Sequence, residues 1–435
     1  MNNKGQELWN KAKNIIPGGN MLLSKRPEMF LPEKWPSYYS QAKGCQIWGL
    51  DNEKYIDMSI MGIGTNILGY SHPKVDEAVA NVIKMGNMCT LNCPEEVLLA
   101  EKLISLHPWA DMVRFARTGG EADAIAIRIA RAATAREVVA ICGYHGWHDW
   151  YLATNIESYS KLEEHLLPGL EPNGVPQSLQ NTVKPFSFNK FHQLEDIASK
   201  NNLAAVIMEV QRSTPPEKGF LESIRKLCDK KGIVLIFDEC TSGFRETFGG
   251  LHKKYKVNPD MAMFGKALGN GYAITSIIGK RSVMEAAQNS FISSTFWTER
   301  IGPTSALKTL DVMEEEKSWE VITKQGIKLR NYWRELASQN NLSIEFFGLS
   351  SLSGFKFKSK NSMKYKTFIT QELLKKKFLA SNTCYLSIAH TDEIIENYIE
   401  LLEPVFKKIA KCESGENIDS LLEGPVCHDG FRRLN

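Results

Sequence analysis

The sequence predicts an α/β protein with two parts: a large domain around a mostly parallel central sheet, and a smaller α+β domain made from both chain ends. Short, almost wholly apolar runs at residues 138–142, 204–208 and 233–237 predict the large domain. Helix-like stretches separate these runs, and such runs are typical of strands buried on both faces of a parallel sheet. Each chain end is too short to form a good core alone, so we expect the two ends to share one.

The expected domain boundaries follow from these patterns. We expect the large domain at residues 66–315, with residues 1–65 and 316–435 forming the smaller one. A helix near residues 7–13 and short strands near 45–48 and 54–58 are expected at the amino-terminal end. A strand over 352–357 and a helix over 391–411 are expected near the other end.

The composition is that of an ordinary globular protein of 435 residues, with 43% hydrophobic and 24% charged residues. A formal net charge of +3 gives no reason to expect nucleic acid or a membrane surface as a partner. No apolar run approaches the ~18 residues that span a bilayer, and the first residues do not resemble a signal peptide. Nine cysteines, an odd number, favour a reducing compartment over a disulfide scaffold, so we expect a cytoplasmic protein.

A pair of glycines marks a candidate anion site. Gly119 and Gly120 stand directly before a predicted helix, because apolar residues recur at helical spacing from Ala122 to Ala133. The N-terminus of a helix has free N–H groups and a partial positive charge, which suit a phosphate. An ordinary strand-to-helix turn explains the glycines about equally well.

An acid follows the last of the three apolar runs. Asp238 and Glu239 lie at the carboxyl end of the predicted strand 233–237, where ligands bind in open α/β sheets. A partly buried carboxylate is costly unless it meets a cation, and a protonated pyridine nitrogen is one such cation. A solvated loop acid, or an ion pair with Arg245, is the alternative interpretation.

A lysine stands among apolar residues and glycines further along the chain. Lys266 lies in Phe264-Gly-Lys-Ala-Leu-Gly269, and desolvation there would lower its pKa and favour imine chemistry. Most lysines are surface charges. The order of glycine turn, strand-end acid and lysine on one α/β domain makes Lys266 a catalytic candidate.

These blocks together resemble a known family. The sequence is similar to the fold-type I, pyridoxal-phosphate-dependent enzymes of the class III aminotransferase group, and most of all to their glutamate-1-semialdehyde 2,1-aminomutase branch. The most specific blocks are residues 118–122, 144–146, 237–245 and 264–271, and the similarity extends from residue 17 to residue 393.

The resemblance implies how pyridoxal 5′-phosphate would be held. Lys266 would form the aldimine with the cofactor and later move a proton between the substrate Cα and the cofactor C4′. Asp238 would pair with the pyridinium nitrogen, which keeps the ring protonated as an electron sink. Gly119 and Gly120 would bind the phosphate through backbone N–H groups. The family usually has a hydroxyl residue at the position of Gly120.

The same resemblance assigns the remaining cofactor contacts. Tyr144 would stack on one ring face with His145 behind it. Cys240 stands against the opposite face, where the family usually has valine. Glu209 matches a strand-end glutamate of the family. Thr295 matches a threonine that reaches the phosphate of the neighbouring subunit, which implies a homodimer with active sites at the subunit interface.

No metal site is expected. His145 and His148 are spaced like a metal-binding pair, but they lie within the block that resembles a cofactor-stacking segment. Cys89 and Cys93 have no second pair with ligand spacing, so a zinc site is not expected.

The sequence departs from the aminomutase pattern where the substrate would bind. The arginine that grips the substrate carboxylate is replaced by Lys25, or by Arg26 if one residue is inserted, and lysine is a poorer bidentate clamp. Arg212 could supply an anion contact instead. Residues 154–165 lack the glycines of the mobile aminomutase loop.

We therefore expect an aminotransferase that moves an amino group from an amino donor to an aldehyde or ketone acceptor. An oxidised sugar or a sugar-acid precursor of a surface glycan is a candidate acceptor. Intramolecular transfer, as in the aminomutases, is the alternative. A catalytically silent scaffold on the same fold is a hypothesis of another class. A nicotinamide dehydrogenase has little support, because no Gly-x-Gly-x-x-Gly follows the first strand of an α/β unit.

Overall fold

The computed structural model describes residues 4–157, 161, 169–431 and 434. The chain divides into two compact units. The larger is Pro73–Trp319, and the smaller combines Met1–His72 with Glu320–Asn435. The boundaries expected from the sequence, at 65/66 and 315/316, lie a few residues before the observed ones.

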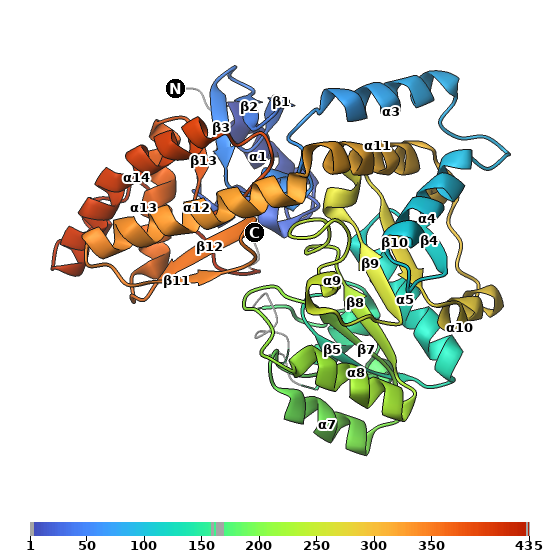
Figure 1. The fold of residues 1–435 in the computed structure, drawn as a ribbon. Helices are drawn as coiled ribbons and strands as arrows, with labels where there is room; N and C mark the ends of the chain where they lie inside the picture. Colours follow the sequence, from blue (N-terminus) through green and yellow to red (C-terminus); the bar gives the residue numbers. More distant parts are fainter. Residues whose placement is uncertain (1–3, 158–160, 162–168, 432–433, 435) are drawn as a thin grey trace. The chain divides into compact units, whose positions relative to one another are not determined.

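A mostly parallel sheet forms the centre of the larger unit (Figure 1). Its strands lie in the order β4 (Met112–Ala116), β10 (Thr275–Gly279), β9 (Met261–Phe264), β8 (Val234–Asp238), β7 (Leu203–Glu209), β5 (Val138–Cys142) and β6 (Val183–Pro185). Strand β10 is antiparallel to both of its neighbours, and the other pairs are parallel. The expected α/β class is therefore confirmed.

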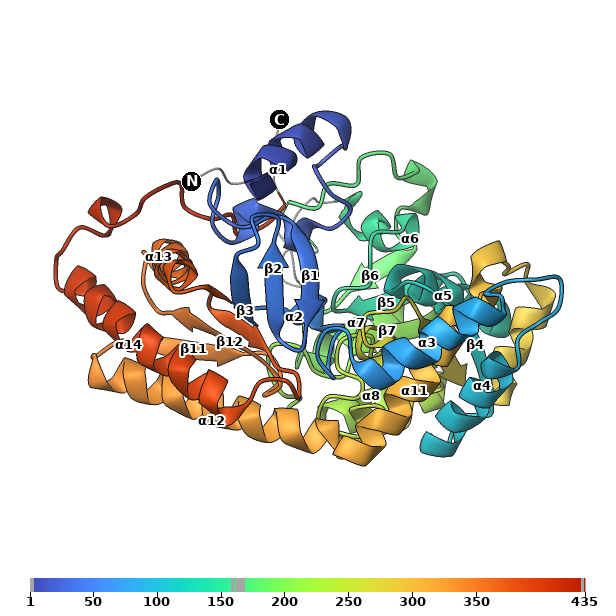
Figure 2. The same cartoon turned by 90° about the horizontal axis from the view of Figure 1, so that it is seen from above.

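Helices cover both faces of this sheet (Figures 1 and 2). Helix α5 (Gly119–Thr134) packs on one face, where Ile125 and Ile129 join a buried cluster with Ile207 and Ile236. Helices α7 (Phe191–Lys200) and α8 (Phe220–Lys231) lie on the other face. Every residue of β7 and β8 is buried, which explains why these strands are continuous apolar runs.

Among the remaining helices of the larger unit, α6 and α10 contribute residues to the same buried cluster as α5. Helix α11 packs along α3 and α4. The elements are α3 (Pro73–Met85), α4 (Pro94–Leu106), α6 (Asp149–Leu152), α9 (His252–Tyr255), α10 (Arg281–Met284) and α11 (Ile301–Glu316).

The candidate residues share one edge of the sheet. The glycine turn follows β4, Tyr144 follows β5, Glu209 ends β7, Asp238 ends β8 and Lys266 follows β9. These strands run in one direction, so their carboxyl ends meet at a single edge, where open α/β sheets bind ligands.

The two adjacent acids after β8 have different partners. Glu239 is buried, and its carboxylate accepts hydrogen bonds from the N–H of Leu251 at 2.5 Å and from Nδ1 of His252 at 2.6 Å. Burial opposes ionisation, but these hydrogen bonds hold the pKa of Glu239 below its usual value. Glu239 therefore anchors the connection after β8, which leaves Asp238 as the acid of the site.

The smaller unit combines both chain ends in one sheet (Figure 1). Strands β1 (Tyr39–Lys43), β2 (Gln46–Gly49) and β3 (Lys54–Met58) form an antiparallel meander, and β13 (Phe378–Ala380) pairs parallel to β3. A second sheet has the order β11 (Ile344–Phe347), β12 (Leu352–Phe357), β14 (Thr383–Tyr385). The pairing of β3 with β13 explains why neither end forms a core alone.

The helices of the smaller unit are longer than the sequence patterns predicted. Helix α1 is Lys4–Ile15, and α14 is Asp392–Glu413, where Thr391 caps the first turn. The others are α12 (Ser318–Gln339) and α13 (Ser362–Lys375). Within the described ranges, no helix is both long and apolar enough to cross a membrane.

Candidate active site

The start of α5 forms a cradle for an anion. Thr118 caps the helix, and its Oγ1 accepts a hydrogen bond from the N–H of Glu121 at 3.4 Å. The Glu121 carboxylate accepts in return from the N–H of Thr118 at 2.8 Å. This capping box satisfies the flanking N–H groups. The N–H groups of Gly119 and Gly120 have no intrahelical acceptor and are left for a ligand.

A buried hydrogen bond joins the loop after β5 to the last residue of β8. His145 Nδ1 donates to Asp238 Oδ2 at 2.8 Å, and the other carboxylate oxygen accepts from the N–H of Cys240 at 3.0 Å. Burial would raise the pKa of Asp238, but the hydrogen bond and charge of His145 bring it below the usual value. Asp238 is therefore a buried carboxylate that keeps its charge, which suits a cationic ligand.

Lys266 has an unusual backbone and a perturbed amine. Its φ of +43° lies in the left-handed region, where residues other than glycine are strained and cluster at functional sites. Its Nζ donates to Thr241 Oγ1 at 2.5 Å. Burial, followed by the positive charge of Arg212, lowers the pKa of Lys266. A larger share of neutral, nucleophilic amine results.

Cys240 connects the glycine turn to the lysine turn. A Cβ atom added to Gly119 would lie 3.6 Å from Cys240 Sγ, and one added to Gly265 would lie 3.4 Å from it. The sulfur is thus in contact distance of both turns. Burial, then the charge of Asp238, raises the pKa of Cys240 well above its usual value. Cys240 is a packing residue here and not a nucleophile.

Tyr144, Glu209 and Arg212 form a second connected group. The N–H of Tyr144 donates to Glu209 Oε2 at 3.2 Å, and Arg212 Nη1 donates to Glu209 Oε1 at 2.8 Å. The Arg212 guanidinium lies 6.0 Å from the centre of the Tyr144 ring, in cation–π geometry. The Arg212 side chain is 27% exposed, so it can contact a ligand while it stays paired with Glu209.

The other predicted residues make no described contact with these groups. Thr295 is exposed in the short helix Thr295–Thr298, and no described contact joins it to the other candidates. Lys25 is exposed, whereas Arg26 is buried with its guanidinium 5.6 Å from the Phe431 ring. The roles of these three residues stay predictions. Most of the expected loop at 154–165 lies outside the described residues.

Asp123 is a site residue that the sequence patterns did not reveal. It is buried on α5. One carboxylate oxygen of Asp123, one ring nitrogen of His145 and one carboxylate oxygen of Asp238 all lie within 4.8 Å of one another. Burial, followed by the charges of Asp238 and Glu209, raises the pKa of Asp123 well above its usual value. An acid on the apolar face of a helix that begins at a glycine turn was the available signal. We interpret the group as the electrostatic environment of Asp238, because His145 Nδ1 already donates to that carboxylate.

A comparison with protein families decides the class of this protein. Residues 32–392 match the family described as aminotransferase class-III. The chain belongs to this family. Its members depend on pyridoxal phosphate, so the expected family, enzyme class and cofactor are confirmed. Small-molecule amino donors and carbonyl acceptors are the substrates of the family.

Relatives and solved structures match over nearly the whole chain. The 3-aminobutyryl-CoA aminotransferase of Cloacimonas acidaminovorans is 31% identical and covers 94% of this chain and 98% of its own length. A glutamate-1-semialdehyde 2,1-aminomutase of Hyperthermus butylicus is 30% identical, with coverages of 93% and 98%. The FumI protein of Sphingopyxis sp. MTA144, solved in its PLP internal aldimine form, has a TM-score of 0.84 at 23% identity, with coverages of 96% and 99%. These relatives include a transferase and a mutase, so family membership is compatible with both reactions.

The residues of this edge fit pyridoxal phosphate. The free N–H groups of the α5 cradle suit its phosphate, the Asp238 carboxylate suits its ring nitrogen, and the Lys266 amine suits its carbonyl carbon. Within the described residues, His145 Nε2, Asp123 Oδ1 and His148 Nδ1 are buried polar atoms without a hydrogen-bond partner. Buried polar atoms are rarely left unpaired, so these atoms indicate a polar ligand.

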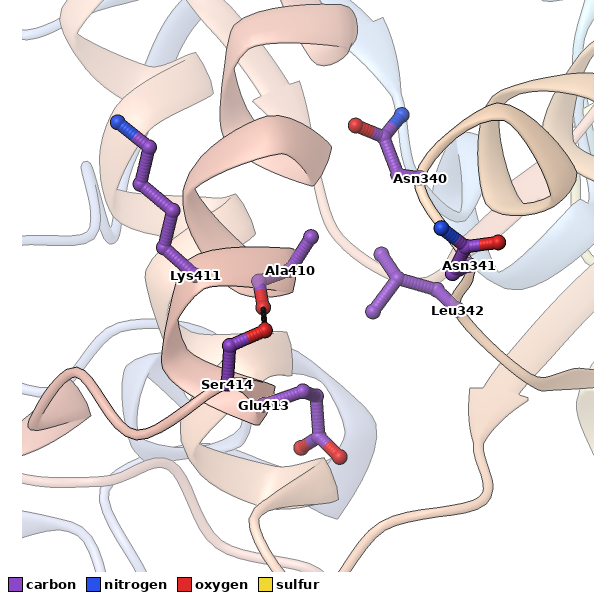
Figure 3. Close-up of a pocket in the computed structure, with 7 residues that line it drawn as sticks. All are labelled: Asn340, Asn341, Leu342, Ala410, Lys411, Glu413 and Ser414. Carbon is purple, nitrogen blue, oxygen red and sulfur yellow. Dashed lines mark hydrogen bonds between the residues drawn. The ribbon is translucent and has the colours of Figure 1, made fainter.

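A separate pocket lies in the smaller unit (Figure 3). It is formed after the end of α12 and at the end of α14, and its lining residues are Asn340, Asn341, Leu342, Ala410, Lys411, Glu413 and Ser414. None of these is a candidate residue, and we assign this pocket no part in the site.

Because carboxylates crowd around Asp123, we expect replacement of its carboxyl group by a neutral amide to stabilise the folded protein, by an amount that depends on pH. Because the pKa of Asp123 is raised on folding, the contribution of Asp123 to the free energy of unfolding falls as pH rises above about 4, where the unfolded chain loses this proton. Asp123→Asn abolishes that loss. We expect the cofactor-free variant to gain about 1–3 kcal/mol at about pH 8 and less at about pH 5. Urea unfolding at both pH values measures the gain. The exposed Asp196→Asn is the control, and a gain that does not change with pH would contradict the interpretation.

Proposed function

We propose that this protein is an aminotransferase that moves an amino group from an amino donor to an aldehyde or ketone acceptor, with pyridoxal phosphate bonded to Lys266. The supporting observation is that the Lys266 amine, the charged Asp238 carboxylate and the α5 anion cradle follow strands whose carboxyl ends share one sheet edge. The bound cofactor supplies an electron sink that stabilises negative charge at the substrate Cα.

Each residue contributes a distinct step. Asp238 holds the proton on the ring nitrogen, because the hydrogen bond from His145 keeps its carboxylate ionised. Lys266 Nζ, whose lowered pKa favours the neutral amine, would hold the cofactor through its carbonyl carbon with loss of water. Once an incoming substrate amine has released it, the same amine would accept the proton of the substrate Cα. Tyr144 and Cys240 would contact the ring, and the N–H groups of Gly119 and Gly120 would bind the phosphate.

Arg212 supports a substrate with an acid group. Its guanidinium is partly exposed beside Tyr144, so a substrate carboxylate would be bound next to the ring. Lys25 or Arg26 is the second candidate for this contact. Among acceptors with these groups we propose an oxidised sugar or sugar acid that precedes a surface glycan. All nine cysteines are free thiols, which favours the cytoplasm; cell fractionation would check this location.

The simplest test of the cofactor site is the loss of the bound chromophore. Lys266→Ala should remove the absorption band near the violet that appears when the protein binds pyridoxal phosphate. It should also lower the rate of amine transfer at least about 10²–10⁴-fold, because the proton-transfer group is lost. Lys226→Ala, an exposed change on α8, should keep both. Absence of the band in the unaltered protein would favour a catalytically silent scaffold.

A second candidate reaction is intramolecular amine transfer, because an aminomutase is 30% identical over 93% of this chain. A transferase should release only about one equivalent of carbonyl product per active site from the amino donor, and continue only when a carbonyl acceptor is added. Stopped assays with and without a keto acid measure this. Sustained turnover on a single amino substrate would identify a mutase.

We also propose a homodimer, in which Thr295 reaches the phosphate at the partner subunit's site. Two apolar side chains near Thr295 in the sequence are exposed to solvent: Phe291 is 88% exposed and Phe296 is 69% exposed. Exposed apolar groups of this size are typical of interfaces. Sedimentation should give twice the mass of the chain, and Phe296→Lys should raise the dimer dissociation constant about tenfold or more. Ile327→Lys, at an exposed site on α12, is the control. A monomeric unaltered protein would disprove the dimer.

A further inference from the structure

An imidazole fills the space beside Gly120. A Cβ atom added to Gly120 would lie 2.9 Å from both Cε1 and Nδ1 of His148. That distance is shorter than any ordinary contact of a Cβ atom. A side chain at position 120 and the His148 ring therefore cannot both occupy these places unless one of them shifts.

The loop after β5 brings His148 to the start of α5. Gly146, at φ +93°, approaches so closely that its added Cβ would lie 3.0 Å from the Cα of Gly120. The Trp147 ring stacks on His148, with centroids 4.5 Å apart and planes at 26°. The same loop carries Tyr144 and His145. The position of His148 is thus set by the same segment that carries the predicted ring contacts.

One polar atom of His148 lacks a partner. Within the described part of the chain, its Nδ1 is buried and makes no hydrogen bond. Nδ1 is one of the two ring atoms nearest the missing side chain of Gly120, so it lies at the N-terminus of α5, where the anion cradle is. A buried ring nitrogen without a partner is costly, and an anion at the cradle would satisfy it.

The charges around His148 do not prevent this contact. Burial lowers the pKa of His148, and the carboxylates of Glu121 and Asp149 oppose that shift. Glu121 is itself engaged by backbone N–H groups. A neutral imidazole carries one N–H, which can be placed on Nδ1 and donate to a phosphate oxygen.

We propose that His148 donates from Nδ1 to the cofactor phosphate and replaces the hydroxyl that Gly120 lacks. The inference rests on the proposed cofactor site. Gly120 then has two functions: its N–H binds the phosphate, and its missing side chain admits the imidazole.

The affinity for pyridoxal phosphate, compared with that for pyridoxal, tests the proposal. Pyridoxal has the same ring and carbonyl carbon but no phosphate. Each ligand is titrated into the full-length cofactor-free protein. The His148→Ala variant should bind pyridoxal phosphate about 10–100-fold more weakly, the effect of losing a hydrogen bond to a charged group. The same variant should leave pyridoxal binding within about twofold. His192→Ala, on the exposed part of α7, is the matched control and should change neither.

A reciprocal exchange makes the test independent of packing losses. Gly120→Ser alone should weaken pyridoxal phosphate binding, because its Cβ meets the His148 ring. Gly120→Ser combined with His148→Ala should bind about tenfold tighter than His148→Ala alone, because the serine hydroxyl takes the vacated place. If His148 only packed against its neighbours, the added serine would not restore this affinity for pyridoxal phosphate.

The outcomes separate this inference from the proposed function. Equal losses for both ligands in His148→Ala, or no recovery in the double variant, would overturn the role of His148 while the unaltered protein still binds the cofactor. Failure of the unaltered protein to form the Lys266 chromophore would overturn both. Melting temperatures of the cofactor-free variants would show whether a loss reflects unfolding instead, and the double variant decides that case.

Discussion

The hydrogen bond from His145 to Asp238 is the interaction on which the rest of the site depends. Burial favours the neutral acid, and a neutral Asp238 could not hold a proton on a ring nitrogen. The imidazole of His145 reverses this preference. Asp238 ends β8 and His145 lies shortly after β5, two strands away in the same sheet. The sheet backbone therefore helps to set the distance between the two groups.

The charges around this pair form a balanced group. Burial and the negative charges of Asp238 and Glu209 raise the pKa of Asp123, while Arg212 supplies positive charge. Arg212 lowers the pKa of Lys266, and it is itself held by Glu209. A cofactor with a negative phosphate and a positive ring nitrogen matches this arrangement, because each of its charges has a fixed opposite charge or dipole near it.

The sequence predicted those features that depend on short stretches of chain. Apolar runs marked β5, β7 and β8 because strands covered on both faces need no polar residues. Lys266 and Asp238 were found from their local surroundings and their order along the chain. The same information placed Glu239 beside Asp238 but could not separate their roles, which depend on the contact of Glu239 with His252.

Features that depend on packing between distant segments were not predictable in this way. Asp123 stands out as an acid on the buried face of α5, but the sequence does not show that this face meets Asp238. His148 matters because its loop meets Gly120, and only the close approach of Gly146 reveals that contact. The sequence showed that glycine at position 120 lacks a side-chain hydroxyl that could bind a phosphate. The structure reveals what occupies its place.

The parallel pairing of β3 with β13 has a consequence for synthesis of the chain. About three hundred residues separate these two strands, and the whole larger unit lies between them. On the ribosome, the larger unit is complete long before β13 emerges, so it can fold while the amino-terminal meander still lacks its last neighbour. The exposed edge of β3 is therefore an aggregation hazard during translation, and it is closed only when β13, which ends at Ala380, has left the exit tunnel.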